Sequence, residues 1–133
     1  MKKHKTKHIV VGGSPTLLNR GYGSIIESYD KIIRVNLCHT YGTNSSTTRS
    51  DLGKRTNIWC SSWNTKKNKE IGYKNFFLPE TLDDKTVWFR HPQGKADYSH
   101  IIEEKFGNFE SDILTCGAKE GYGQAFIICG YKK

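Results

Sequence analysis

The stretch VVGGSPTLLNRGYG, residues 10–23, places a strand, a glycine turn and a helix start in succession. The β-branched residues within His8–Val11 favour a buried strand, which ends at a glycine pair beginning with Gly12, where the missing Cβ lets the backbone turn sharply. Ser14 is a suitable N-cap for a helix whose first residue is Pro15. The free N–H groups of such a helix start suit a phosphate or carboxylate, although the same pattern also occurs in turns that only reverse the chain.

Length, charge and cysteine content limit the class of protein. We treat residues 1–133 as a single domain, long enough to bury a core. The 21 basic and 13 acidic side chains give a net charge of +8, which favours anionic partners such as a nucleotide sugar, nucleic acid or acidic lipid headgroups. The chain has no apolar run long enough for a membrane span and no secretory signal, so we expect a cytoplasmic protein. The four cysteines form no CxxC pair, and we expect reduced thiols and no metal site.

Strand and helix patterns alternate along the rest of the chain. Three further strands are predicted, at Lys31–Val35, Asn57–Cys60 and Thr86–Arg90. The segment ADYSHIIEEKF, residues 96–106, has apolar residues at helical spacing, with Asp97 or Ser99 as its expected N-cap. This alternation predicts an α/β fold with a mainly parallel sheet flanked by helices, and with a ligand site at the carboxyl ends of the strands.

The end of the chain predicts one more glycine turn and a weak helix. The segment LTCGAKEGYGQAFIICGYKK, residues 114–133, has glycines inside the apolar stretch and Gly130 as a suitable C-cap. An α/β fold normally continues from such a helix into another strand. We therefore expect a domain that is incomplete at its C-terminus.

Two common phosphate-binding motifs fit the sequence poorly. GGSPTL is not G-x-G-x-x-G, and Gly53 to Thr56 resembles only the tail of a P-loop and precedes a strand, so we interpret Gly53 as a turn residue with positive φ. Asn36 is more informative because it follows the second predicted strand, where its amide can bind a base or ribose in the same crevice as the Gly12 turn. An asparagine at a strand end also often only caps a turn.

Taken in order, these stretches resemble a known family. VVGGSPTLLNRGYGSIIESYDKIIRVN, followed by DLGKRTNIW, resembles the long sialyl motif of the sialyltransferases, glycosyltransferase family 29. The ending LTCGAKEGYGQAFIICGYKK is similar, more weakly, to the short sialyl motif of that family. No resemblance is found across residues 61–110, where the loops that choose the acceptor are expected.

The resemblance implies a Rossmann-like glycosyltransferase that transfers sialic acid from CMP-sialic acid to a glycan hydroxyl, with inversion and without a metal or further cofactor. Its partners are then a nucleotide-sugar donor and a glycan acceptor. The donor-binding residues that the resemblance implies are Gly12, Gly13, Ser14, Asn36, Thr115, Cys116 and Gly117. Gly13 stands where the family has an asparagine, which removes a hydrogen bond worth about 0.5–1.5 kcal/mol.

No residue is assigned to catalysis from the sequence. The resemblance implies a histidine base beyond the short motif, and the five histidines of this chain lie in other contexts (His4, His8, His39, His91 and His100). Turnover is therefore expected to be lost if the domain is incomplete. Two alternatives stay open: a non-catalytic nucleotide- or glycan-binding module of the same fold, and a small basic nucleic-acid-binding protein, the weakest of the three.

Overall fold

The computed structural model describes residues 6–12, 19–35, 50–61 and 78–114. Its strands form one sheet in the order β1-β2-β3-β4-β5, and every neighbouring pair is parallel. The strands are β1 (His8–Val11), β2 (Lys31–Val35), β3 (Ile58–Ser61), β4 (Thr86–Phe89) and β5 (Glu110–Ile113), and the helices are α1 (Gly23–Glu27) and α4 (Pro92–Phe106). The predicted α/β fold with a parallel sheet is confirmed.

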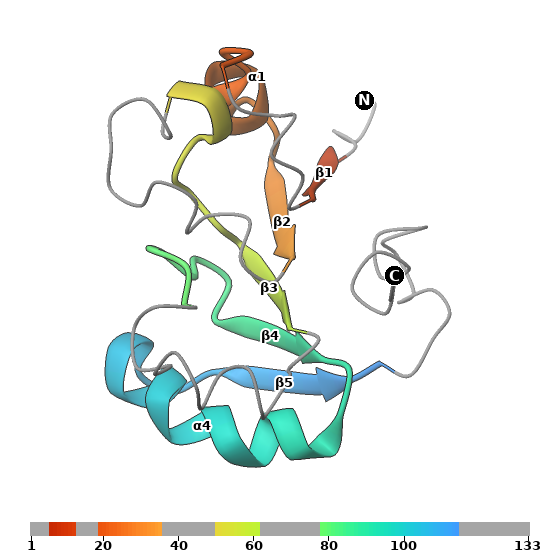
Figure 1. The fold of residues 1–133 in the computed structure, drawn as a ribbon, viewed down its shortest axis with the longest axis vertical. Helices are drawn as coiled ribbons and strands as arrows, with labels where there is room; N and C mark the ends of the chain where they lie inside the picture. The colour runs from red at the N-terminus through yellow and green to blue at the C-terminus, as the bar shows by residue number, and fades with distance from the viewer. Residues whose placement is uncertain (1–5, 13–18, 36–49, 62–77, 115–133) are drawn as a thin grey trace, which may run out of the picture.

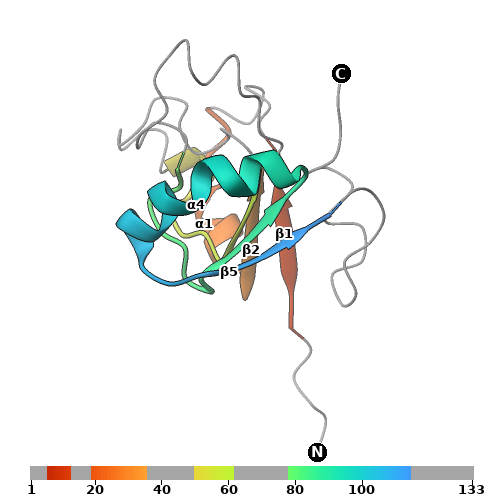
Figure 2. The ribbon, with the colours of Figure 1, turned by 90° about the horizontal axis from the view of Figure 1, so that it is seen from below.

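Both helices cover the same face of the sheet. The strand register aligns four residues across this face, Val11, Arg34, Trp59 and Val87. Ile26 of α1 belongs to the same buried cluster as Val11, while Tyr98 of α4 meets the Trp59 ring edge-on, with ring centroids 5.9 Å apart. Accordingly, α1 lies near β1 and β2, and α4 runs beside β4 and β5 (Figures 1 and 2). Strands added in one direction through right-handed crossovers place their helices on one side, as seen here.

The opposite face of the sheet is also apolar and buried. Its core residues are Ile33, Val35, Ile58, Cys60 and Trp88, with Val10 and Leu114 packed against them. Within the described ranges, no helix lies on this second face. Strands buried on both faces require nearly continuous apolar sequence, which β3 and β4 have, whereas β2 buries Arg34 on the face that the helices cover.

The predicted strands agree with the structure to within one residue. β1 and β2 have the predicted bounds. β3 starts at Ile58, one residue later than predicted, because the side chain of Asn57 accepts the hydrogen bond from the Ile32 N–H at 2.8 Å. β4 ends at Phe89 and leaves Arg90 just beyond the strand.

The predicted start of the long helix is wrong. α4 begins at Pro92, with His91 as its N-cap, because proline has the φ required at the first helical position and lacks an N–H that would need a partner. Asp97 lies inside the helix, where it accepts a hydrogen bond from Gln93 at 2.9 Å, and Ser99 donates to the Lys95 carbonyl. The helix ends before Gly107, whose φ of 82° is one that glycine adopts readily.

β5 was not predicted. Its sequence, Glu110–Ile113, is mostly polar and has no apolar alternation, and the strand forms by pairing with β4 along its whole length. The helices predicted from Pro15 and within residues 114–133 lie outside the described residues. In the part of the chain that the structure describes, no helix is long and apolar enough to cross a membrane.

Candidate functional site

The predicted donor site lies at the carboxyl edge of the sheet, the edge at which β1 to β5 end. Gly12 directly follows β1, and among the described residues no atom lies within 4 Å of a Cβ built on it. Protein packing therefore does not explain this glycine. The other six implied residues, Gly13, Ser14, Asn36, Thr115, Cys116 and Gly117, lie outside the described residues; Asn36 directly follows β2 in the chain.

Arg90 also lies at the carboxyl edge, directly after β4. Its N–H donates to the Ser61 carbonyl at 3.0 Å, which extends the ladder between β3 and β4 by one bond. Its side chain is half-buried, and the guanidinium nitrogen Nη1 is fully buried with no hydrogen-bond partner. The next residue, His91, is exposed, and its side chain makes no capping bond to α4. An arginine nitrogen withdrawn from water without an acceptor is costly. Arg34 has two such nitrogens within the sheet, whereas Arg90 has one at the carboxyl edge.

The opposite, amino edge is joined by a network of polar side chains. Asn57 accepts from the Ile32 N–H and from Arg55 Nη1, at 2.8 and 2.7 Å, and its amide donates to Asp84 at 3.1 Å. The second oxygen of Asp84 pairs with Lys31 Nζ at 2.6 Å. This amino-edge network, Lys31, Arg55, Asn57 and Asp84, ties the starts of β2, β3 and β4 together.

Arg55 connects this network to the end of α1. Its guanidinium donates to the carbonyls of Glu27 and Tyr29, at 3.2 and 2.6 Å. In return, Glu27 Oε1 accepts from the backbone N–H groups of Lys54 and Arg55, at 3.3 and 3.2 Å. The charged groups at this edge thus bind the protein itself, which is a structural role.

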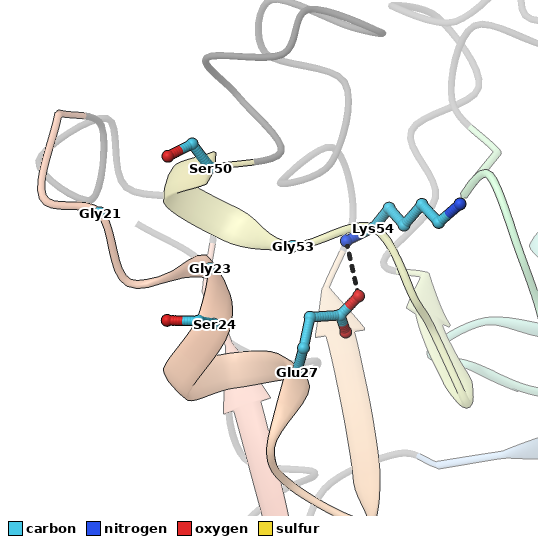
Figure 3. Close-up of a pocket in the computed structure, with 7 residues that line it drawn as sticks. All are labelled: Gly21, Gly23, Ser24, Glu27, Ser50, Gly53 and Lys54. Atoms are coloured by element: carbon cyan, nitrogen blue, oxygen red, sulfur yellow. Dashed lines mark hydrogen bonds between the residues drawn. The ribbon is translucent and has the colours of Figure 1, made fainter.

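A small pocket lies beside this end of α1. Its volume is about 400 Å³, and it is lined by Gly21, Gly23, Ser24, Glu27, Ser50, Gly53 and Lys54, which we call the glycine pocket. The Glu27 carboxylate accepts from the Lys54 N–H, while the Lys54 side chain extends away from Ser24 and Ser50 (Figure 3). The charged side chains of Glu27 and Lys54 therefore do not point toward one another within the glycine pocket. The pocket thus lacks the convergent polar groups typical of a ligand site.

Gly53 has the turn conformation predicted from the sequence. Its φ is +69°, and a Cβ at this position would lie 2.9 Å from Glu27 Cγ. The P-loop interpretation fails here because the Lys54 and Arg55 N–H groups bind Glu27, where a P-loop would bind phosphate.

A family model described as glycosyltransferase family 29 (sialyltransferase) matches residues 1–110. The chain belongs to this family. A comparison with curated proteins gives no match. The parallel sheet agrees with the Rossmann-like fold implied by the resemblance. The family match ends before Thr115, so the three donor residues in the short-motif region depend on sequence resemblance alone.

Contacts in the structure show that part of the long motif of this glycosyltransferase family 29 chain is structural. In DLGKRTNIW, Asp51, Gly53 and Arg55 hold neighbouring segments together, and so do not face the carboxyl edge. Sequence reasoning missed three polar positions, Arg55, Asn57 and Arg90. Each lies one to three residues outside a strand, and a polar residue just beyond an apolar strand is the signal by which they could have been found.

Asp51 provides a test of this architecture through pH. Its carboxylate accepts from the N–H groups of Asn19 and Gly21, at 2.6 and 2.9 Å, and these bonds hold the pKa of Asp51 below its ordinary value of 3.8. A lowered pKa stabilises the fold above the unfolded pKa, and this contribution is lost as the pH falls through the folded pKa.

We expect Asp51→Asn to be less stable than the wild type at pH 7 and to approach it as the pH falls below about 4, since the wild type then loses its charge-assisted bonds. Thermal unfolding of both proteins between pH 7 and pH 3 measures this difference. A gap in melting temperature that stays constant over this range would contradict the role given to the carboxylate.

Proposed function

We propose that this chain binds CMP-sialic acid at the carboxyl edge of its sheet, with the nucleotide at the ends of β1 and β2, as a sialyltransferase. Family membership supports this proposal. Its main structural support is Gly12, which follows β1 at the edge where parallel sheets bind ligands. No described atom lies within 4 Å of a Cβ built on Gly12, which leaves space for a ligand beside the backbone. Asn36, next after β2, is the proposed ligand of the cytidine monophosphate.

The charge along the chain supports an anionic donor. The segments that follow β2, β3 and β5, residues 36–49, 62–77 and 115–133, contain only two acidic side chains, Glu70 and Glu120. Their basic side chains are Arg49, Lys66, Lys67, Lys69, Lys74, Lys119, Lys132 and Lys133. This excess of positive charge in the sequence favours an anionic donor such as a nucleotide sugar with its phosphate and carboxylate.

In the proposed reaction, an acceptor hydroxyl oxygen bonds to the anomeric carbon of sialic acid. The bond from that carbon to the phosphate oxygen breaks, and CMP leaves with the electron pair, while the hydroxyl proton passes to a base. Of the described histidines, His91 is at the carboxyl edge, whereas His8 starts β1 at the amino edge and His100 lies within α4. We assign the base to none of them.

The experiment is a calorimetric titration of the full chain with CMP, CMP-sialic acid and UMP. We expect saturable binding of CMP in preference to UMP, and a loss of about ten-fold in CMP affinity for Asn36→Ala, because a buried hydrogen bond to the ligand is removed. Asn108→Ala is the matched control, since Asn108 is exposed and precedes β5 at the opposite edge. Absence of CMP binding by the folded chain, or equal losses in both variants, would refute the proposal.

The non-catalytic alternative makes the same binding prediction and differs in turnover. It is favoured by Gly13, which stands where the resemblance expects an asparagine. Release of CMP from CMP-sialic acid in the presence of lactose separates the two: a transferase releases CMP together with sialylated lactose, and a binding module releases neither.

A further inference from the structure

We propose that Arg90 binds the carboxylate of a sialic acid, the acidic sugar carried by the donor or by the acceptor. This inference rests on the proposed function, because it places Arg90 in the same site. It adds a specificity-determining residue outside the sialyl motifs, within the residues 1–110 that the family model matches.

The first observation is the unmet hydrogen bonding of Arg90. Its Nη1 atom is buried with no partner, and no carboxylate of the described residues forms an ion pair with its guanidinium. The arginine at the amino edge differs in this respect, since Arg55 binds three carbonyls and the Asn57 amide oxygen. Arg55 is thus a structural arginine, whereas the bonding capacity of Arg90 remains for a ligand.

The second observation is the place of Arg90 along the sheet. It follows β4, which is separated from β2 by one intervening strand, so about 10 Å lies between the two strand ends. A nucleotide bound at the ends of β1 and β2 would therefore lie close enough for its sugar, or the acceptor next to it, to reach Arg90. The planar guanidinium fork matches a carboxylate with two parallel hydrogen bonds, which favours the sugar's carboxylate as its ligand.

The test is a calorimetric titration of the full chain, as wild type, Arg90→Gln, Arg90→Lys and Lys7→Gln. The ligands are CMP, CMP-sialic acid, 3′-sialyllactose and lactose. Lys7→Gln is the matched control, because it removes one positive charge from an exposed side chain at the amino edge. Circular dichroism checks that each variant is folded.

We expect Arg90→Gln to weaken the binding of an acidic sugar ligand about ten-fold or more, and to leave CMP affinity within about two-fold of the wild type. A selective loss for CMP-sialic acid assigns the carboxylate to the donor, and a selective loss for 3′-sialyllactose assigns it to the acceptor. The affinity of Arg90→Lys for the acidic sugar ligand is expected to lie between those of the wild type and Arg90→Gln, since lysine keeps the positive charge but lacks the planar pair of donors.

Three results would overturn the inference: equal affinities of wild type and Arg90→Gln for both acidic ligands, an equal loss for CMP, or the same loss in Lys7→Gln. If Arg90→Gln does not fold, wild-type affinities in Arg90→Lys overturn it instead. If the wild type binds no CMP, the proposed function fails, while the comparison of 3′-sialyllactose with lactose still tests Arg90. Wild-type protein that also binds no acidic ligand overturns both.

Discussion

Replacing Trp59 with alanine is expected to lower the free energy of unfolding by about 3–5 kcal/mol, the largest of the expected stability effects. Trp59 is 2% exposed and lies in the middle strand of the sheet. It joins β3 to α4 through the edge-on contact with Tyr98, and its cluster includes Leu78, Leu82, Val87, Phe89, Ile101 and Ile102. Alanine would leave a cavity between the sheet and the helix.

Urea unfolding followed by circular dichroism measures this loss. Trp59→Phe is the matched control, because it keeps an aromatic ring against Tyr98 and should cost less than half as much. A loss below about 1 kcal/mol for Trp59→Ala would mean that α4 does not pack on this face as described.

Replacing Asn57 with alanine is expected to cost about 3 kcal/mol, the second-largest effect. Asn57 is 5% exposed, and its side chain serves Ile32, Arg55 and Asp84 at once. Alanine leaves the buried Ile32 N–H without its acceptor. It also removes the hydrogen bonds through which Asn57 links Arg55 to Asp84. Removing one partner of a buried hydrogen bond costs more than the bond itself contributes.

The same urea measurement compares Asn57→Ala with Asn108→Ala, which removes an exposed asparagine near the same edge. A double-mutant cycle between Asn57→Ala and Asp84→Ala should show a coupling of about 1 kcal/mol. Additive effects, or a loss for Asn57→Ala no larger than for Asn108→Ala, would show that the amino-edge network does not hold the strands together.

The sequence predicted β1 to β4 because their apolar, β-branched runs stand between glycine and polar segments. It missed β5, since Glu110, Ser111 and Asp112 carry no apolar pattern and the strand depends on its pairing with β4. It also placed the start of α4 too late, because Asp97 and Ser99 have the chemistry of N-caps and yet bond within the helix. N-cap preference alone cannot tell that Asp97 and Ser99 lie inside the helix. Pro92 gives the correct start, because proline is favoured at the first helical position.

The sequence predicted a ligand site at the carboxyl ends of the strands. The structure places Gly12 directly after β1, while ligand binding there stays a prediction. The sequence could not divide the long motif into binding and structural residues. Asp51, Gly53 and Arg55 are part of the motif, and only their contacts with Gly21, Glu27 and Tyr29 reveal that they organise the other parts of the chain. The position of Arg90 just after an apolar strand could have drawn attention to it, but its unmet hydrogen bond is visible only in the structure.

The central claim is that CMP binds at the carboxyl edge of the sheet, and amide hydrogen exchange of the full chain with and without saturating CMP tests it most directly. We expect CMP to slow exchange in residues 10–14 and 34–38, which include the ends of β1 and β2. The glycine pocket, represented by residues 21–24 and 50–54, should exchange as before. Protection confined to the glycine pocket, or no change in any segment, would contradict the claim.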